Sequence, residues 1–130
     1  TGAVVVTTPS QVALADVRKA IEMFRQVDVP VLGIVENMSF FSCPHCQGKI
    51  DVFGEGEGRR MAELFSVPLL GEIEIDPRIR IGGDSGKPVA AQGETDGVPG
   101  AKSFYAIARA VAARVEEVTA ASAGPVVKID

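Results

Sequence analysis

The chain has 130 residues, 46% of them hydrophobic, which is enough for one core of ordinary size but not for two full domains. Its formal net charge of -4 excludes an overall positive potential that would attract nucleic acid or an anionic membrane. No apolar stretch reaches the roughly 20 residues that a membrane span needs, and the N-terminus lacks the pattern of a signal peptide. We expect a cytoplasmic protein whose partners are small molecules and other proteins.

Two apolar runs separated by an amphipathic helix define the first part of the chain. Residues 3–8 are mainly β-branched and end at Pro9, a pattern typical of a strand covered on both faces. Ser10 can cap a helix that ends near residues 27–28, and residues 31–35 predict a second buried strand. The order strand, helix, strand predicts a right-handed parallel crossover and therefore an α/β fold with a parallel sheet.

The regular pattern is lost from residue 39 to residue 58, where Cys, Pro, His and several glycines predict a loop or a small hairpin excursion. The chain beyond it should return to regular structure and complete a single domain over residues 1–119. The elements expected there are a helix at 59–65, a strand at 67–73, a turn at Asp76-Pro77, an Ala-rich helix at 101–119 and a flexible tail at 120–130.

The segment Cys43-Pro44-His45-Cys46 is the most specific chemical feature of the sequence. Two thiolates separated by two residues can bind one metal ion or cluster from a single turn of loop. A closed zinc site or a four-thiolate cluster needs four ligands, whereas the chain has two cysteines and one histidine. Two copies related by a two-fold axis, each donating Cys43 and Cys46, would complete a four-thiolate set. We therefore expect a homodimer bridged by a cluster.

Two other functions for the cysteines stay open. The pair is compatible with a structural zinc site in a non-enzymatic scaffold protein. The same four residues also occur in thiol-disulfide oxidoreductases of the DsbA type, in which a helix N-terminus lowers the pKa of the first thiol. That activity requires a helix starting at Cys43, but residues 47–53 are typical of a turn followed by a strand.

Polar residues follow the carboxyl ends of two predicted strands, where ligands bind in open parallel sheets. Asn37 follows the second strand, and its amide can both donate to and accept from a base edge. Asp76, Pro77 and Arg78 follow the third strand and combine a turn with a cation. We expect these residues to contact a nucleotide, the alternative for the charged turn being simple solvation.

Two glycine-rich runs resemble phosphate-binding loops without meeting their requirements. Residues 54–58 are not spaced as GxGxxG and do not directly follow a buried strand, so a hinge before a helix is expected there. Residues 82–88 imitate a Walker A loop, but Ile81 replaces its first glycine and Pro88 replaces the Ser or Thr that binds magnesium. Neither run is a P-loop.

Several stretches, taken in order, carry a family resemblance. They are Thr7-Thr8-Pro9, Val35-Glu36-Asn37-Met38-Ser39, Cys43-Pro44-His45-Cys46, Phe53-Gly54, and Gly71-Glu72-Ile73 through Asp76-Pro77-Arg78-Ile79-Arg80. Together they resemble the Mrp/ApbC family of iron-sulfur cluster carriers, deviant P-loop ATPases related to MinD and nitrogenase iron protein. The resemblance extends to about Arg114.

The resemblance implies a three-layer P-loop NTPase fold of the MinD/ParA type. It also implies a homodimeric ATPase that holds a 4Fe-4S cluster between two CxxC loops and passes it to apo-proteins. By position, Cys43 and Cys46 would be the cluster ligands and Asn37 an adenine contact. The Asp76-Pro77-Arg78 turn would form part of the base pocket.

The resemblance concerns the C-terminal part of that family only. Its lysine-bearing P-loop, magnesium ligands and switch aspartates would precede Thr1. Without them the β- and γ-phosphates of ATP lack both the backbone cradle and the lysine that stabilises the transferring charge. We expect the full-length protein to bind ATP with magnesium and hydrolyse it, and these 130 residues alone not to hydrolyse it.

Overall fold

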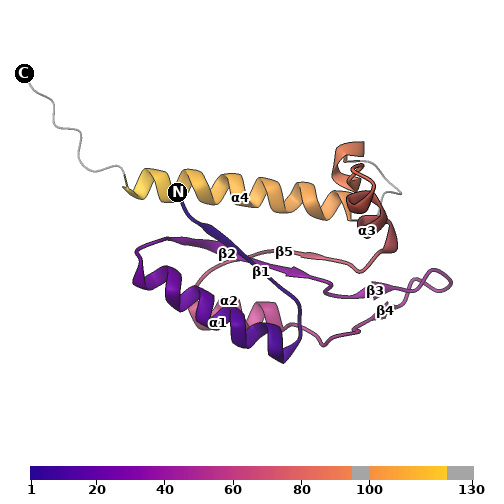
Figure 1. Cartoon of the computed structure of the whole chain (residues 1–130), viewed down its shortest axis with the longest axis horizontal. Helices are drawn as coiled ribbons and strands as arrows, with labels where there is room; N and C mark the ends of the chain where they lie inside the picture. Colours follow the sequence, from indigo (N-terminus) through magenta and orange to yellow (C-terminus); the bar gives the residue numbers. More distant parts are fainter. Residues whose placement is uncertain (95–99, 123–130) are drawn as a thin grey trace, which may run out of the picture.

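A computed structural model gives the structure of the chain and describes residues 1–94 and 100–122 (Figure 1). The strands are β1 (Ala3–Thr7), β2 (Val31–Asn37), β3 (Phe41–Ser42), β4 (Lys49–Ile50) and β5 (Leu69–Ile73). The helices are α1 (Gln11–Gln26), α2 (Glu57–Phe65), α3 (Pro77–Asp84), the 3-10 helix η1 (Val89–Gln92) and α4 (Ala101–Ser122).

Three of the strands form a parallel sheet in the order β1-β2-β5. Figure 1 shows α4 across one face of this sheet and α1 and α2 together on the other, so the described chain has three layers. The two short strands β3 and β4 form a separate antiparallel hairpin. The predicted α/β class with a parallel sheet is confirmed.

Two apolar clusters hold the layers together, one on each face of the sheet. The larger joins Leu14 and Ile21 of α1 and Phe65 of α2 to strand residues that include Ile34, which is fully buried. The smaller joins Val35, Leu70 and Ile73 to the inner face of α4. Helix α1 begins where the sequence indicates, because the Ser10 side chain accepts a hydrogen bond from the backbone N–H of Ala13 at 3.3 Å.

The prediction that β1 is covered on both faces is wrong. Val5 is buried, but Val4 and Val6 on the other face are 37% and 58% exposed. Successive side chains of a strand point to opposite faces, and α4 packs on β2 and β5. A run of β-branched residues therefore does not by itself show that both of its faces are covered by this chain.

The predicted turn at Asp76-Pro77 is also wrong, because these residues start α3. Asp76 is the N-cap, its carboxylate accepting from the N–H of Arg78 at 2.7 Å, and Pro77 occupies the first turn, where no N–H is required. The glycine run at 82–88 lies at the end of this helix, consistent with its exclusion as a P-loop. Helix α4 continues to Ser122, three residues into the stretch expected to be flexible, and residues 123–130 lie outside the described part.

No helix in the described part of the chain is both long and apolar enough to cross a membrane.

A buried carboxylate connects the end of β2 to the start of α2. Glu36 is 1% exposed, and one carboxylate oxygen accepts from the Ser39 hydroxyl while the other accepts from the Gly58 N–H, both at 2.5 Å. A Cβ atom at residue 58 would lie 2.6 Å from the same oxygen, so only glycine allows this approach. Residues 39 and 58 bound the predicted excursion, and Glu36 therefore holds both of its ends.

Replacing Glu36 by Ala is expected to lower the free energy of unfolding by about 2–4 kcal/mol, because the buried Gly58 N–H loses its acceptor. Glu36→Gln should cost less, since an amide oxygen can accept from Gly58 while its NH2 group donates to the Ser39 hydroxyl. Urea unfolding measures both, with the exposed Glu63 of α2 changed to Ala as a control. Equal stability of Glu36→Ala and Glu63→Ala would contradict this role for Glu36.

Candidate metal centre

The cysteines lie in the turn of the β3-β4 hairpin. Phe41 pairs with Ile50 and Ser42 with Lys49, and the Cys43 N–H continues the ladder to the Gly48 carbonyl at 2.9 Å. The Gln47 N–H returns to the Cys43 carbonyl at 2.9 Å and closes the turn. The excursion is therefore a hairpin that presents both cysteines together at its tip. The sequence predicted a loop or a small hairpin, and the structure has the hairpin.

The local backbone favours the thiolate at Cys43. Backbone hydrogen bonds from Cys46 and then His45, together with the Cys46 side chain, lower the pKa of the Cys43 thiol below its usual value. Thiolate is the form of cysteine that binds metals. Cys43 is partly exposed and Cys46 is exposed, so both sulfurs are accessible to a ligand brought from solution.

The hairpin provides two ligands and not four. Within the described residues, no group of three or more His, Cys, Asp or Glu side chains is placed to hold a metal ion. His45 stands between the cysteines in the turn and does not complete such a group. A four-ligand centre at this hairpin would need two further ligands from outside the described residues.

The thiol-disulfide oxidoreductase alternative has no structural support at this position. Residues 44–46 form a turn between two strands, and no helix starts at Cys43. The first thiol therefore lacks the helix N-terminus that makes such cysteines strong oxidants. Of the turn and strand predicted at 47–53, the structure has a strand only at Lys49–Ile50 (β4), and the turn lies earlier, at residues 44–46.

Large apolar side chains in the hairpin and next to it along the chain are exposed. Met38, Ile50, Val52 and Phe53 are between 43% and 52% exposed, although each is large and apolar. Ile50 belongs to β4, and the other three come from the two connections that join the hairpin to β2 and α2. Exposed apolar groups that gather near one feature are characteristic of interaction surfaces.

The candidate nucleotide residues lie at the carboxyl edge of the sheet. Asn37 ends β2 and pairs in register with Ile73, the last residue of β5, three positions before Asp76. The Asn37 side-chain oxygen accepts from the N–H of Met38 at 3.0 Å, which leaves its NH2 group for another acceptor. Asn37, Asp76, Pro77 and Arg78 thus lie at one edge of the sheet. The sequence predicted this, because it placed them after the carboxyl ends of two parallel strands.

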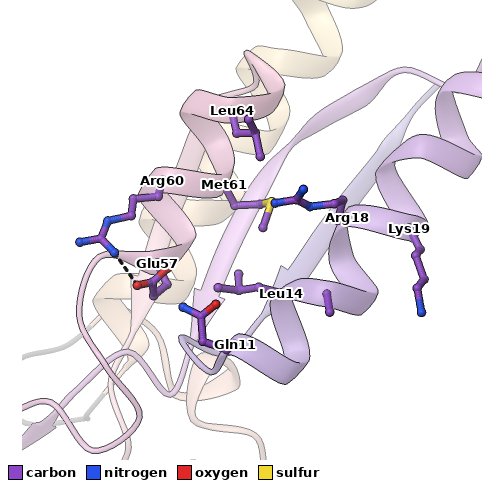
Figure 2. Close-up of a pocket in the computed structure, with 9 residues that line it drawn as sticks. Gln11, Leu14, Arg18, Lys19, Glu57, Arg60, Met61 and Leu64 are labelled. Carbon is purple, nitrogen blue, oxygen red and sulfur yellow. Dashed lines mark hydrogen bonds and ion pairs between the residues drawn. The ribbon is translucent and has the colours of Figure 1, made fainter.

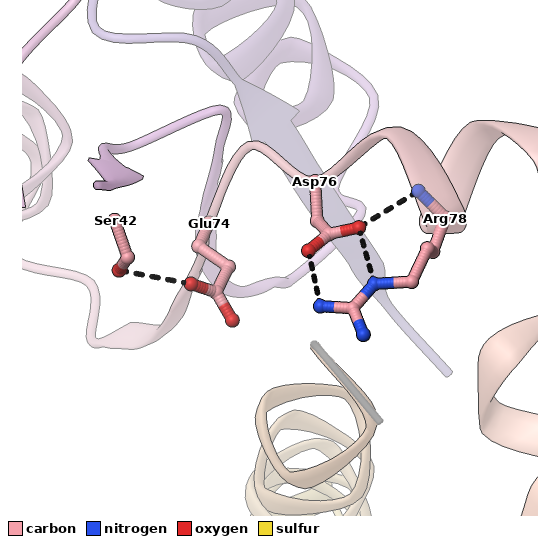
Figure 3. Close-up of polar contacts among 4 residues, drawn as sticks. All are labelled: Ser42, Glu74, Asp76 and Arg78. Carbon is pink, nitrogen blue, oxygen red and sulfur yellow. Dashed lines mark hydrogen bonds and ion pairs between the residues drawn. The ribbon is translucent and has the colours of Figure 1, made fainter. Parts of the chain in front are cut away.

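Figure 3 shows that Asp76 orients Arg78. Its carboxylate accepts from the Arg78 N–H and from two nitrogens of the guanidinium, Nε at 3.0 Å and Nη2 at 2.9 Å. Hydrogen bonding from the Arg78 guanidinium is the largest cause that lowers the pKa of the Asp76 carboxyl, and the bond from the Arg78 N–H lowers it further. The Arg78 side chain is 61% exposed, so a fixed cation faces solvent at this edge.

The cysteine hairpin and the carboxyl edge are joined through one stretch of backbone. The Ser39 N–H donates to the Ile73 carbonyl at 3.0 Å, and the Ile75 N–H donates to the Phe40 carbonyl at 2.7 Å. At the base of the hairpin the Ser42 hydroxyl donates to the Glu74 carboxylate at 3.2 Å (Figure 3). The strand that leads to Cys43 is therefore bonded directly to the segment that leads to Asp76.

Sequence reasoning identified Asn37 at this edge but missed the role of Glu36. A charged residue directly after a buried apolar run is a signal for a carboxylate with internal partners, because unpaired buried charge is costly. The partners themselves, Ser39 and Gly58, follow only from the fold.

Substitutions of Asp76 can separate its two contributions to stability, the N-cap of α3 and the ion pair with Arg78. Asp76→Ala should lower the free energy of unfolding by about 1 kcal/mol at pH 6 through loss of the cap, whereas Asp76→Asn keeps the cap and should cost less. The folded pKa of Asp76 lies below the unfolded value, so its contribution is present above about pH 4 and is lost as pH falls through the folded pKa. Unfolding at pH 6 and pH 2.5 measures this. An Asp76→Ala deficit that stays constant with pH would contradict it.

Comparison with known proteins now identifies the family. The model of the ParA family, described as NUBPL iron-transfer P-loop NTPase, matches residues 1–112. The iron-sulfur cluster carrier protein of Pyrococcus furiosus is 44% identical over 116 residues, which are 89% of this chain and 38% of that protein. The chain thus spans less than half the length of the curated relatives it matches.

Solved structures share the fold. A nucleotide-binding protein of Archaeoglobus fulgidus, solved with ADP, superimposes with a TM-score of 0.60 and 36% identity over 75% of this chain and 41% of that one. The cell division ATPase MinD of Pyrococcus furiosus does so with a TM-score of 0.60 and 27% identity over 90% of this chain and 43% of that one. The resemblance inferred from the sequence is confirmed, and the chain belongs to the ParA family of NUBPL-type iron-transfer P-loop NTPases.

Proposed function

We propose that the protein carries an iron-sulfur cluster on Cys43 and Cys46 and transfers it to apo-proteins. The observation that carries the proposal is the exposed hairpin turn that presents two thiols together and favours the thiolate at Cys43. The name and 44% identity of the Pyrococcus furiosus relative support it. Transfer is then a ligand exchange in which thiolates of the recipient replace Cys43 and Cys46 at iron, with no change of oxidation state required.

The cluster is of the 4Fe-4S type and bridges a homodimer in this proposal. One hairpin supplies two thiolates, and such a cluster takes four. A two-fold axis beside the hairpin brings Cys43 and Cys46 of two copies together and requires a self-complementary surface around it. The exposed Met38, Ile50, Val52 and Phe53 provide apolar area there.

The nucleotide part of the proposal places the base of ATP against the carboxyl edge. The free NH2 group of Asn37 can donate to the base, and Arg78, held by Asp76, offers a cation and a flat guanidinium. The relative solved with ADP supports nucleotide binding. We assign hydrolysis with magnesium to the full-length protein, because the glycine run at 82–88 spans the end of α3 and the residues after it and is not a P-loop. We place this protein in the cytoplasm.

Anaerobic reconstitution with iron and sulfide tests the cluster. The chain should take up about four irons and four sulfides per two copies and turn brown, because both CxxC turns are needed to complete the ligand set. Cys43→Ser/Cys46→Ser should stay colourless and monomeric. Iron and sulfide assays with size-exclusion chromatography measure both results. Binding of zinc alone, by a monomer, would instead support the structural-zinc alternative.

Substitution of Asn37 tests the nucleotide edge. In the full-length protein Asn37→Ala should weaken ATP binding about tenfold, the loss expected for one or two hydrogen bonds to the base. GTP, whose base edge differs, should show a smaller change. Calorimetric titration measures the two dissociation constants. An unchanged ATP affinity would remove Asn37 from the proposed site and leave the cluster proposal untouched.

A further inference from the structure

A groove separates α1 from α2 on the face of the sheet opposite α4 (Figure 2). Its volume is about 410 Å³. Leu14 and Met61 form its apolar floor and are 5% and 6% exposed, while Leu64 on the α2 wall is 59% exposed. An apolar hollow of this size accommodates a few large side chains from another molecule.

The groove is preformed. Both helices belong to the larger apolar cluster through Leu14 and Met61. At their far ends the Arg25 guanidinium donates to the Phe65 carbonyl at 2.5 Å and lies 5.0 Å from the centre of the Phe65 ring. The spacing between the two helices is therefore fixed before any ligand binds, which lowers the entropic cost of binding.

The charge around the groove is opposite to that of the chain. Three cations line it, Arg18 and Lys19 from α1 and Arg60 from α2, against one carboxylate, Glu57. The chain as a whole has a formal net charge of -4. The groove is therefore a local positive site with an apolar floor, and it favours a ligand that is both apolar and anionic.

These cations are available to a ligand. Among the residues that the structure describes, Arg18 forms no ion pair, and in Figure 2 its side chain extends from α1 toward the α2 wall. Arg60 bonds Glu57 at 2.6 Å, but its side chain is 73% exposed. Lys19 lies 3.8 Å from Asp16 with both side chains about 80% exposed. The Lys19–Asp16 pair is solvated on both sides and therefore weak, while Glu57 is 17% exposed and the exposed side of Arg60 can still accept a second carboxylate.

We propose that this groove binds an acidic amphipathic helix of a partner protein. A third helix can lie along two neighbouring helices and insert an apolar stripe spaced i, i+3, i+4, i+7 over Leu14, Met61 and Leu64. Asp or Glu residues beside that stripe then reach Arg18 and Arg60 on opposite walls. A nucleic acid would leave the apolar floor unfilled, and the net charge of the chain opposes an anionic membrane.

The site is separate from the proposed cluster ligands and does not depend on them. Its α2 wall nevertheless starts at Glu57, at the end of the excursion that carries Cys43 and Cys46 and beside the Gly58 that Glu36 holds. A partner seated in the groove therefore lies along the helix that ends the cysteine excursion.

Selection from a displayed library of random 16-residue peptides tests the proposal. Wild-type chain should enrich peptides with apolar residues at helical spacing flanked by Asp or Glu. Fluorescence anisotropy should then show that Arg18→Glu/Arg60→Glu weakens the enriched peptide at least tenfold and that binding falls as salt is raised. Leu64→Asp should weaken it as well.

Arg59→Glu is the matched control, because Arg59 is the exposed neighbour of Arg60 on α2 and does not line the groove. It should change the peptide affinity less than twofold, with helix content by circular dichroism equal in all variants. An equal loss in Arg59→Glu would overturn the proposal. So would a failure to enrich acidic apolar peptides, or binding of phosphatidylserine vesicles through Arg18 and Arg60 in place of peptide.

Discussion

The carboxylate of Glu36 is the interaction on which the presentation of the cysteines depends. It is buried at the end of β2 and accepts one hydrogen bond from each end of the excursion, at Ser39 and at Gly58. A buried charge is tolerated only when its oxygens are satisfied, so the two ends must stay at this point for the fold to be stable. The excursion is thereby closed at its base, and the first turn of α2 is held against the end of β2.

The closed base attaches the cysteine hairpin to the sheet. The hairpin tip holds its cysteines at the surface, while its first strand is bonded to the segment that follows β5. That segment leads to Asp76 and Arg78, and β2 leads to Asn37. A nucleotide bound at this edge would therefore act on backbone that is bonded directly to the cysteine hairpin. In the proposed carrier, these hydrogen bonds would connect the nucleotide site to the cysteines that hold the cluster.

Local signals explain what the sequence predicted. The β-branched runs, the Ser10 cap and the apolar face of α1 act within one element or between neighbours, and they yielded the parallel α/β fold and the hairpin excursion. The cysteine spacing and the residues at the strand ends yielded the candidate site, because parallel strands end at a common edge. The CxxC pattern alone is compatible with a metal and a redox function, and the turn at residues 44–46 lacks the helix start that the redox function requires.

Other features depend on contacts between residues that are far apart in the chain, which the local sequence pattern does not reveal. Helix α3 was missed because Gly82 and Gly83 disfavour a helix, although Asp76 and Pro77 form a good start. The exposure of Val4 and Val6 depends on where α4 lies, and the role of Glu36 depends on Gly58, a residue 22 positions away. The groove between α1 and α2 likewise forms only when the two helices are packed on one face.

The central claim is that two hairpins, each closed at its base by Glu36, share one cluster. Native mass spectrometry of the protein reconstituted without oxygen tests it most directly, because it weighs chains and inorganic atoms in one particle. The account predicts a particle of two chains with four irons and four sulfides, about the composition of one 4Fe-4S cluster. A cluster retained by a single chain, or one zinc ion per chain without sulfide, would contradict it.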